Sequence, residues 1–181
     1  MKKIADHLRK KNIAEYLIYM WQVEDLIRAN NCNIDDITKY IESEFQIDEK
    51  EKEEAIEWFD NLIQMMREEG VIERGHLQIN KNIILELAEL HGNLLSSTRY
   101  PYYNAAYYKV LPYIIELKSK NNNSKESEIE TCFEAMYGIL LLRLQNKEIT
   151  AQTEKAIQSI SSMLSMLAGY YEKDRKNEIE W

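Results

Sequence analysis

Residues 12–30 have the sequence NIAEYLIYMWQVEDLIRAN, and this stretch predicts a helix that is apolar around most of its circumference. At about 100° per residue, the apolar side chains cover more than half of the helix surface. They are Ile13, Tyr16, Leu17, Met20, Trp21, Val23 and Ile27. Because a surface helix needs only one apolar stripe, we expect this helix to lie at the centre of an all-α protein.

Two charged residues of this helix, Glu24 and Arg28, project into its apolar arc beside Leu17, Met20 and Trp21. An unpaired buried charge is very costly, so both charges are expected to be paired inside the protein or held for a ligand. The acid precedes the base by one helical turn, which is the favoured orientation for an ion pair within a helix.

Arg143 is placed in the same unusual way, between Cys132, Met136 and Ile139 on the apolar side of another predicted helix. Glu24, Arg28 and Arg143 could therefore form one buried polar cluster. Three interpretations stay open for it. The first is a structural ion-pair network that fixes the helix register, and the second is that the long arginine side chains reach the rim and keep their charged ends in water. The third is an anion or carboxylate site, since guanidinium groups suit such ligands.

Tyrosines crowd the segment RYPYYNAAYYKVLPYI, residues 99–114. Tyr102 and Tyr107 are expected on the same helix side as Val110 and Ile114. Buried phenols need hydrogen-bond partners, so these tyrosines form either ordinary core or the wall of a pocket. The candidate ligand-binding residues are thus Glu24, Arg28, Arg143, Tyr102 and Tyr107, and no metal ligands are expected.

The composition favours helices and excludes several functions. The chain has 181 residues but only five glycines and two prolines, too few for the turns of a β-rich protein. A net charge of −8 argues against nucleic-acid binding, which needs a basic face. No run of apolar residues is long enough for a membrane span, and the two cysteines lack CxxC spacing. We therefore expect a cytoplasmic protein with reduced thiols.

Periodicity and capping residues predict about seven mostly antiparallel helices in one bundle. Asn33 and Asp48 are the expected N-caps, Gly70 closes a helix, and Pro112 should kink one. A short hairpin fits only at residues 71–79, VIERGHLQI, where Gly75 would supply the turn. The predicted helices span residues 12–30, 34–45, 49–69, 80–96, 101–118, 128–145 and 151–173.

These helices are expected to form a single domain, residues 1–181. The polar stretch SKNNNSKES, residues 119–127, is the clearest linker. It suggests a subdivision into a five-helix part, residues 1–118, and a helical hairpin, residues 128–175, packed on it. The apolar faces of that hairpin are too large to stay exposed to water.

Catalytic and cofactor motifs are absent from the sequence. HExxH and paired Glu-x-x-His motifs are missing, as are GxSxG, Walker and GxGxxG sequences. No metal or other cofactor is therefore expected.

Three segments carry a family resemblance: IAEYLIYMWQVEDLIRA at residues 13–29, EEGVIERGHLQ at 68–78 and ELAELHGNLL at 86–95. They resemble an uncharacterised domain-of-unknown-function family of all-helical bacterial proteins of similar length, found mainly among Bacteroidetes. The resemblance covers nearly the whole chain. It implies a helical cytoplasmic protein and brings no activity, ligand or catalytic residue.

Three functional hypotheses follow. The first is a noncatalytic helical interaction protein that forms a homodimer through the aromatic residues Trp58, Tyr108 and Trp181. The alternative is a small-molecule binding bundle that uses the Glu, Arg and Tyr cluster. The least favoured is an enzyme with Glu24 as general base. Nucleic acid and membrane are not expected partners.

Overall fold

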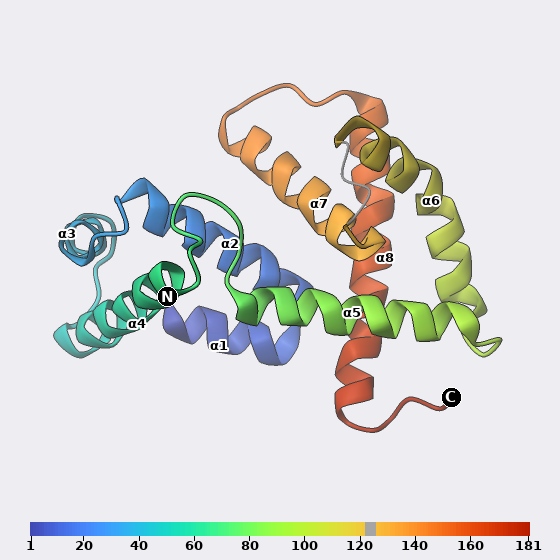
Figure 1. The fold of residues 1–181 in the computed structure, drawn as a ribbon, viewed down its shortest axis with the longest axis horizontal. Coiled ribbons are helices and arrows are strands. Elements are labelled where there is room, and N and C mark those ends of the chain that lie inside the picture. The colour runs from blue at the N-terminus through green and yellow to red at the C-terminus, as the bar shows by residue number, and fades with distance from the viewer. Residues whose placement is uncertain (122–125) are drawn as a thin grey trace. The chain divides into compact units, whose positions relative to one another are not determined.

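The computed structural model describes residues 1–121 and 126–181, which form eight helices and contain no strand (Figure 1). The predicted all-α class is confirmed. The helices are α1 (Lys2–Lys11), α2 (Ile13–Ala29), α3 (Ile34–Glu44), α4 (Glu49–Glu68), α5 (Gln78–Ser96), α6 (Pro101–Asn121), α7 (Glu128–Leu144) and α8 (Ala151–Arg175).

Local capping chemistry explains where several of these helices begin and end. The side chains of Asn33 and Asp48 accept hydrogen bonds from the first turns of α3 and α4, as predicted. After α4, Gly70 takes a φ of +68°, and the Val71 N–H donates to the carbonyl of Met66 at 2.9 Å. This is the glycine helix stop that the sequence indicated.

Helix α1 was missed by the sequence analysis. Its residues are mostly polar, since only Ile4, Ala5 and Leu8 are apolar and only Ala5 is buried. Contacts with residues of α4 and α2 hold this helix in place. Lys3 pairs with Glu51 of α4 at 2.5 Å, and the Tyr19 hydroxyl donates to the Met1 carbonyl at 3.2 Å.

The hairpin predicted at residues 71–79 is wrong. Residues 71–77 form a loop, and α5 already begins at Gln78. The carbonyls of Val71 and Gly75 accept hydrogen bonds from Arg28 of α2. The Arg28 side chain thus donates to backbone carbonyls that would bond to a second strand in a hairpin. The linker predicted at 119–127 is overlapped by α6 up to Asn121, and residues 122–125 lie outside the described part of the chain.

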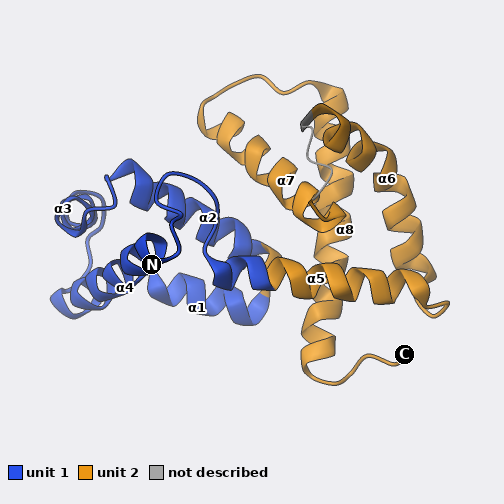
Figure 2. Cartoon of the chain, in the orientation of Figure 1, with its two compact units in different colours: residues 1–11, 15–82 blue, residues 12–14, 83–181 orange. Residues whose placement is uncertain are grey.

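The chain divides into two compact units (Figure 2). Unit 1 comprises Met1–Lys11 and Glu15–Asn82, and unit 2 comprises Asn12–Ala14 and Ile83–Trp181. The division falls within α5, whereas the sequence suggested a subdivision after residue 118, inside unit 2. The single domain over residues 1–181 stays a prediction.

Each unit has its own apolar core. In unit 1, α3 and α1 pack on α4, and fully buried side chains include Leu17, Ile27, Ile37, Ile41, Phe59 and Met66. In unit 2, α6, α7 and α8 pack against one another around Tyr103, Val110, Ile114, Phe133, Met163 and Leu167. The burial of these side chains supplies the main driving force for folding.

Helix α6 runs through Pro112 and curves along its length (Figure 1). Pro112 is exposed, so the carbonyl left without its helical N–H partner lies toward the solvent side. The proline predicted to kink this helix therefore lies within a continuous helix. Among the described residues, no helix is both long and apolar enough to cross a membrane.

Candidate functional site

Glu24 is fully buried in unit 1 and its carboxylate is fully engaged. Oε1 accepts hydrogen bonds from the Leu77 backbone N–H at 3.0 Å and from Asn80 Nδ2 at 2.8 Å, while Oε2 lies 2.6 Å from His76 Nδ1. The His76 ring in turn stacks on Trp21, with 4.0 Å between centroids. The expectation that Glu24 is buried and paired is confirmed, but none of these partners is Arg28.

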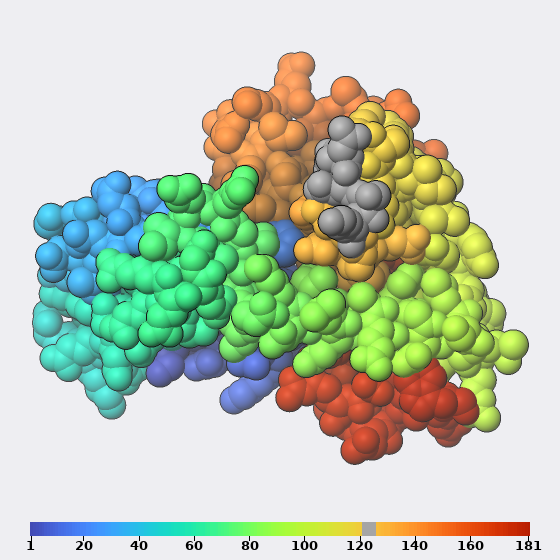
Figure 3. Space-filling view, viewed as in Figure 1, coloured from blue at the N-terminus to red at the C-terminus, as the bar shows by residue number. Residues whose placement is uncertain are grey.

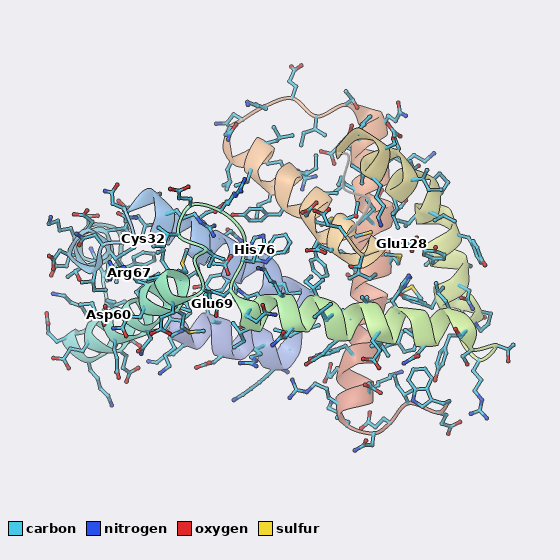
Figure 4. The ribbon with its side chains drawn as sticks, in the orientation of Figure 1. Cys32, Asp60, Arg67, Glu69, His76 and Glu128 are labelled. Atoms are coloured by element: carbon cyan, nitrogen blue, oxygen red, sulfur yellow. The ribbon has the colours of Figure 1, made fainter. Side chains whose placement is uncertain are left out.

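These contacts place the Glu24 carboxylate at the N-terminus of α5. Helix N-termini carry unpaired N–H groups and a partial positive charge, which favour a carboxylate there. Glu69 provides a second carboxylate at this helix N-terminus, since its Oε2 accepts a hydrogen bond from the Gln78 N–H at 2.6 Å. Glu69 and His76 are labelled near the start of α5 in Figure 4.

Arg28 does not pair with Glu24, contrary to the ion pair expected from their spacing. Its Nη1 donates to Asp25 at 2.8 Å, and its Nη2 donates to the carbonyls of Val71, at 3.0 Å, and Gly75. Arg28 thus contacts the 71–77 loop at its first residue and at Gly75, while Glu24 holds the start of the helix that follows it. This geometry supports the structural interpretation of both residues.

The other three candidate residues belong to unit 2, and two of them lie at its surface. The Arg143 side chain is 53% exposed and pairs with Glu154 at 2.8 Å beside a shallow groove between α7 and α8. Tyr102 is 82% exposed, which contradicts its expected place on the buried side of α6. Arg143 occupies the last turn of α7, where a long cationic side chain reaches solvent and interacts favourably with the helix dipole. The prediction that Arg143 is buried is therefore wrong.

Tyr107 is half-buried beside a polar cluster that the sequence did not reveal. His91 Nδ1 lies 2.7 Å from the Tyr103 hydroxyl, and its Nε2 lies 3.5 Å from the Glu128 carboxylate. The Tyr107 ring packs edge-on to His91 at 5.0 Å. Glu128, labelled in Figure 4, is the first residue of α7.

Burial favours the neutral forms of His91 and Tyr107. It lowers the pKa of His91 against the opposing effect of Glu128, and it raises the pKa of Tyr107 to about 12. Burial also raises the pKa of the neighbouring Cys132 thiol to about 12. Since the thiolate is the nucleophile, this cysteine is not activated for chemistry.

An apolar pocket of about 700 Å³ lies within unit 2, between α6, α7 and α8. Its lining includes Leu117 of α6, Ala135, Gly138 and Leu142 of α7, and Ala156 and Ile160 of α8. A Cβ placed on Gly138 would meet no atom within 4 Å, which agrees with open space at this point. The exposed lining residues are Gly138 and polar side chains that include Glu116, Lys120, Lys147 and Gln152.

Metal ligands do not assemble in the described residues. Within residues 1–121 and 126–181, no group of three or more His, Cys, Asp or Glu side chains could hold a metal ion.

Comparison with known proteins gives a family. Residues 2–178 match the family model described as Domain of unknown function (DUF4924). The chain belongs to this family. No curated protein and no solved structure matches it. The family resemblance found in the sequence is thereby confirmed, and no function comes with it.

The pocket of this DUF4924 chain was missed by the sequence analysis, although one signal pointed to it. Gly138 interrupts the apolar run of α7, where an interior glycine costs about 1 kcal/mol relative to alanine. Such a glycine needs a reason in packing or function. Gly138 of α7 and Ala156 of α8 line the same pocket. The sequence alone could not predict this, because it depends on how α7 packs on α8.

Proposed function

We propose that the protein binds a small organic molecule with an apolar body and an anionic end in the α6–α7–α8 pocket. The observation that carries this proposal is the pocket itself, about 700 Å³ in volume and lined mainly by apolar side chains. Ligand pockets of this kind typically enclose about 300–1,000 Å³, have mostly apolar walls, and often lie between the helices of a bundle.

The pocket walls suit an apolar body. Leu117, Ile139, Leu142, Ile157 and Ile160 contribute branched aliphatic side chains from three helices. Each methylene group of a ligand that moves from water into such surroundings gains about 0.8 kcal/mol. Small residues leave the space that the ligand would occupy.

The charged residues of the lining favour an anionic end. They are Glu116, Lys120 and Lys147. Lys120 pairs with Glu116 at 2.6 Å, whereas Lys147 forms no ion pair with any residue described in the structure. A carboxylate or sulfonate head group near Lys147 would balance the remaining positive charge.

The first experiment fills the pocket. Binding of decanoate to the full chain is measured by calorimetry, and Ala156→Phe is expected to weaken it at least tenfold because the ring would occupy the hollow. Ala29→Phe, at an exposed alanine of unit 1, is the matched control. Unchanged decanoate affinity in a folded Ala156→Phe variant would refute the site.

The second experiment tests the charge. Decanol has a similar apolar body without a carboxylate, so the wild-type chain is expected to bind decanoate more tightly. Lys147→Ala should weaken decanoate binding about threefold to fivefold, consistent with an exposed charge interaction, and should leave decanol binding unchanged. Lys81→Ala provides the control for lost positive charge. Equal affinity for decanoate and decanol would refute the proposal that the ligand has an anionic end, but not the proposal that the pocket binds an apolar body.

Glu24 does not support the enzyme hypothesis. Its side chain is fully buried, and every partner described above comes from the protein itself. A general base must reach the proton that it removes.

The thiols favour the cytoplasm as the location of the protein. Cys32 and Cys132 are both buried and free, which suits a reducing compartment. Cell fractionation followed by detection of the untagged chain tests this location, and recovery in an oxidising compartment would contradict it.

A further inference from the structure

Helix α6 carries an apolar stripe on its outer side. Ala105, Tyr108, Pro112 and Ile115 recur every three or four residues and are all exposed, with Tyr108 67% and Ile115 60% accessible. The opposite side of α6 is buried in unit 2 through Tyr103, Val110 and Ile114. Figure 3 shows the surface of α6, in yellow, at the outer edge of unit 2.

This stripe differs from scattered surface apolar residues because it is contiguous. Single exposed apolar side chains are normal, whereas an aligned group on one helix face is typical of an interaction surface. Helix α6 also curves with its convex side away from α7 and α8 (Figure 1). The segment between Tyr108 and Ile115 lies midway along this helix. A second helix would therefore first touch the segment between Tyr108 and Ile115.

Two charges identify the partner helix. Lys109 and Glu116 flank the same edge of the stripe, two helical turns apart. Lys109 forms no ion pair with any residue in the described chain. Glu116 pairs with Lys120 of its own helix through Oε1, and its side chain is 51% exposed. If two copies of α6 cross antiparallel about a two-fold axis midway between these residues, Lys109 lies beside Glu116 of the partner subunit. The symmetry repeats this pairing on the other side of the axis.

We propose that α6 pairs antiparallel with α6 of a second copy of this chain. The apolar stripe supplies the contact, and the two Lys109–Glu116 pairs fix its direction and register. A parallel arrangement would leave the two charges about 10 Å apart along the axis, at a rise of 1.5 Å per residue, so it gains nothing from them. The stripe is thus complementary to itself only in the antiparallel direction.

The test measures the association state of the full chain by sedimentation velocity without added ligand, so that it does not depend on the pocket. Wild type is expected to be a dimer at micromolar concentration. Tyr108→Asp should weaken dimerisation at least tenfold because it buries a charge in the apolar contact. Leu85→Asp, at a comparably exposed leucine of α5, should leave the dimer intact.

A charge exchange tests the register. Lys109→Glu and Glu116→Lys should each weaken the dimer about tenfold by placing like charges together, and the double variant should return to within about threefold of wild type. The double variant also shows that each substitution is tolerated by the fold. A monomeric wild type at 100 µM, a dimer indifferent to Tyr108→Asp, or a double variant weaker than both single variants would each overturn the proposal.

Discussion

Glu24 accepts a hydrogen bond from the backbone N–H of Leu77 at 3.0 Å, and this bond ties the most apolar helix of unit 1 to the start of α5. The two residues are 53 positions apart in the chain. A pattern along α2 predicts that Glu24 is buried, but not which distant amide it meets. The same carboxylate also satisfies His76 and Asn80, so several buried polar groups depend on one side chain.

Removing this carboxylate should be costly. Glu24→Ala leaves the Leu77 N–H and Asn80 Nδ2 without their acceptor in a buried site, and we expect a loss of about 2–4 kcal/mol in the free energy of unfolding. Urea denaturation measures it. Asp25→Ala removes a neighbouring, partly exposed acid and should cost less than about 1 kcal/mol. Equal losses for the two variants would show that Glu24 is hydrated.

Arg28 should control the order of the loop at residues 71–77. Arg28→Met removes the donors to Val71 and Gly75, so cleavage by trypsin after the exposed Arg74 should become several-fold faster. Mass spectrometry identifies the cut. Arg143→Met, which removes an exposed ion pair of unit 2, should leave the rate at Arg74 unchanged, and equal acceleration in both variants would contradict the assigned role.

Glu134 gives the chain a pH dependence of stability. Burial, followed by the nearby Glu126 carboxyl, raises the pKa of Glu134 to about 7. The folded state therefore binds this proton more tightly than the unfolded chain, whose glutamate pKa is about 4.3. Between these values the free energy of unfolding falls as pH rises, and the loss is complete above about pH 7.

Glu134→Gln, which stays neutral, should therefore be more stable than wild type at about pH 8. We expect a gain of about 1 kcal/mol, reduced from the full shift because the group is partly solvated. The gain should shrink as pH falls toward about 4.5. Glu148→Gln, at an exposed glutamate, should show no such trend across the same urea titrations. A constant difference at every pH would refute the explanation.

Replacing Gly138 with alanine should stabilise the folded protein. Gly138→Ala adds a Cβ that meets nothing within 4 Å and removes backbone freedom from the unfolded chain, so α7 should gain about 0.5–1 kcal/mol. The thermal midpoint measures this gain. A lower midpoint would mean that the glycine is needed for the path of the helix.

The fold class and most helices could be predicted because their signals are local. Asn33, Asp48 and Gly70 cap helices in the positions that the sequence indicated, and the apolar arc of α2 correctly predicts the burial of Glu24. Helix α1 was missed because only three of its ten residues are apolar, and its contacts with α4 became visible only in the folded chain. The loop at residues 71–77 resembled a hairpin because Gly75 suits both structures.

The candidate site was harder to predict because it depends on contacts between distant elements. Glu24 and Arg28 have ideal spacing for an ion pair, yet each finds partners on the loop after α4. Arg143 occupies an apolar face on a helical projection, but a position in the last turn lets its side chain reach water. A helical projection predicts the side of the helix on which a residue lies, but not how deeply its side chain is buried.

Each compact unit contains one buried, unbonded thiol: Cys32 in unit 1 and Cys132 in unit 2. An alkylating reagent can reach either sulfur only when the surrounding structure opens. The labelling rates of the two thiols under native conditions would then report the opening free energies of the two halves separately. The chain thus carries its own pair of probes for whether its halves unfold together or one at a time, without any engineered label.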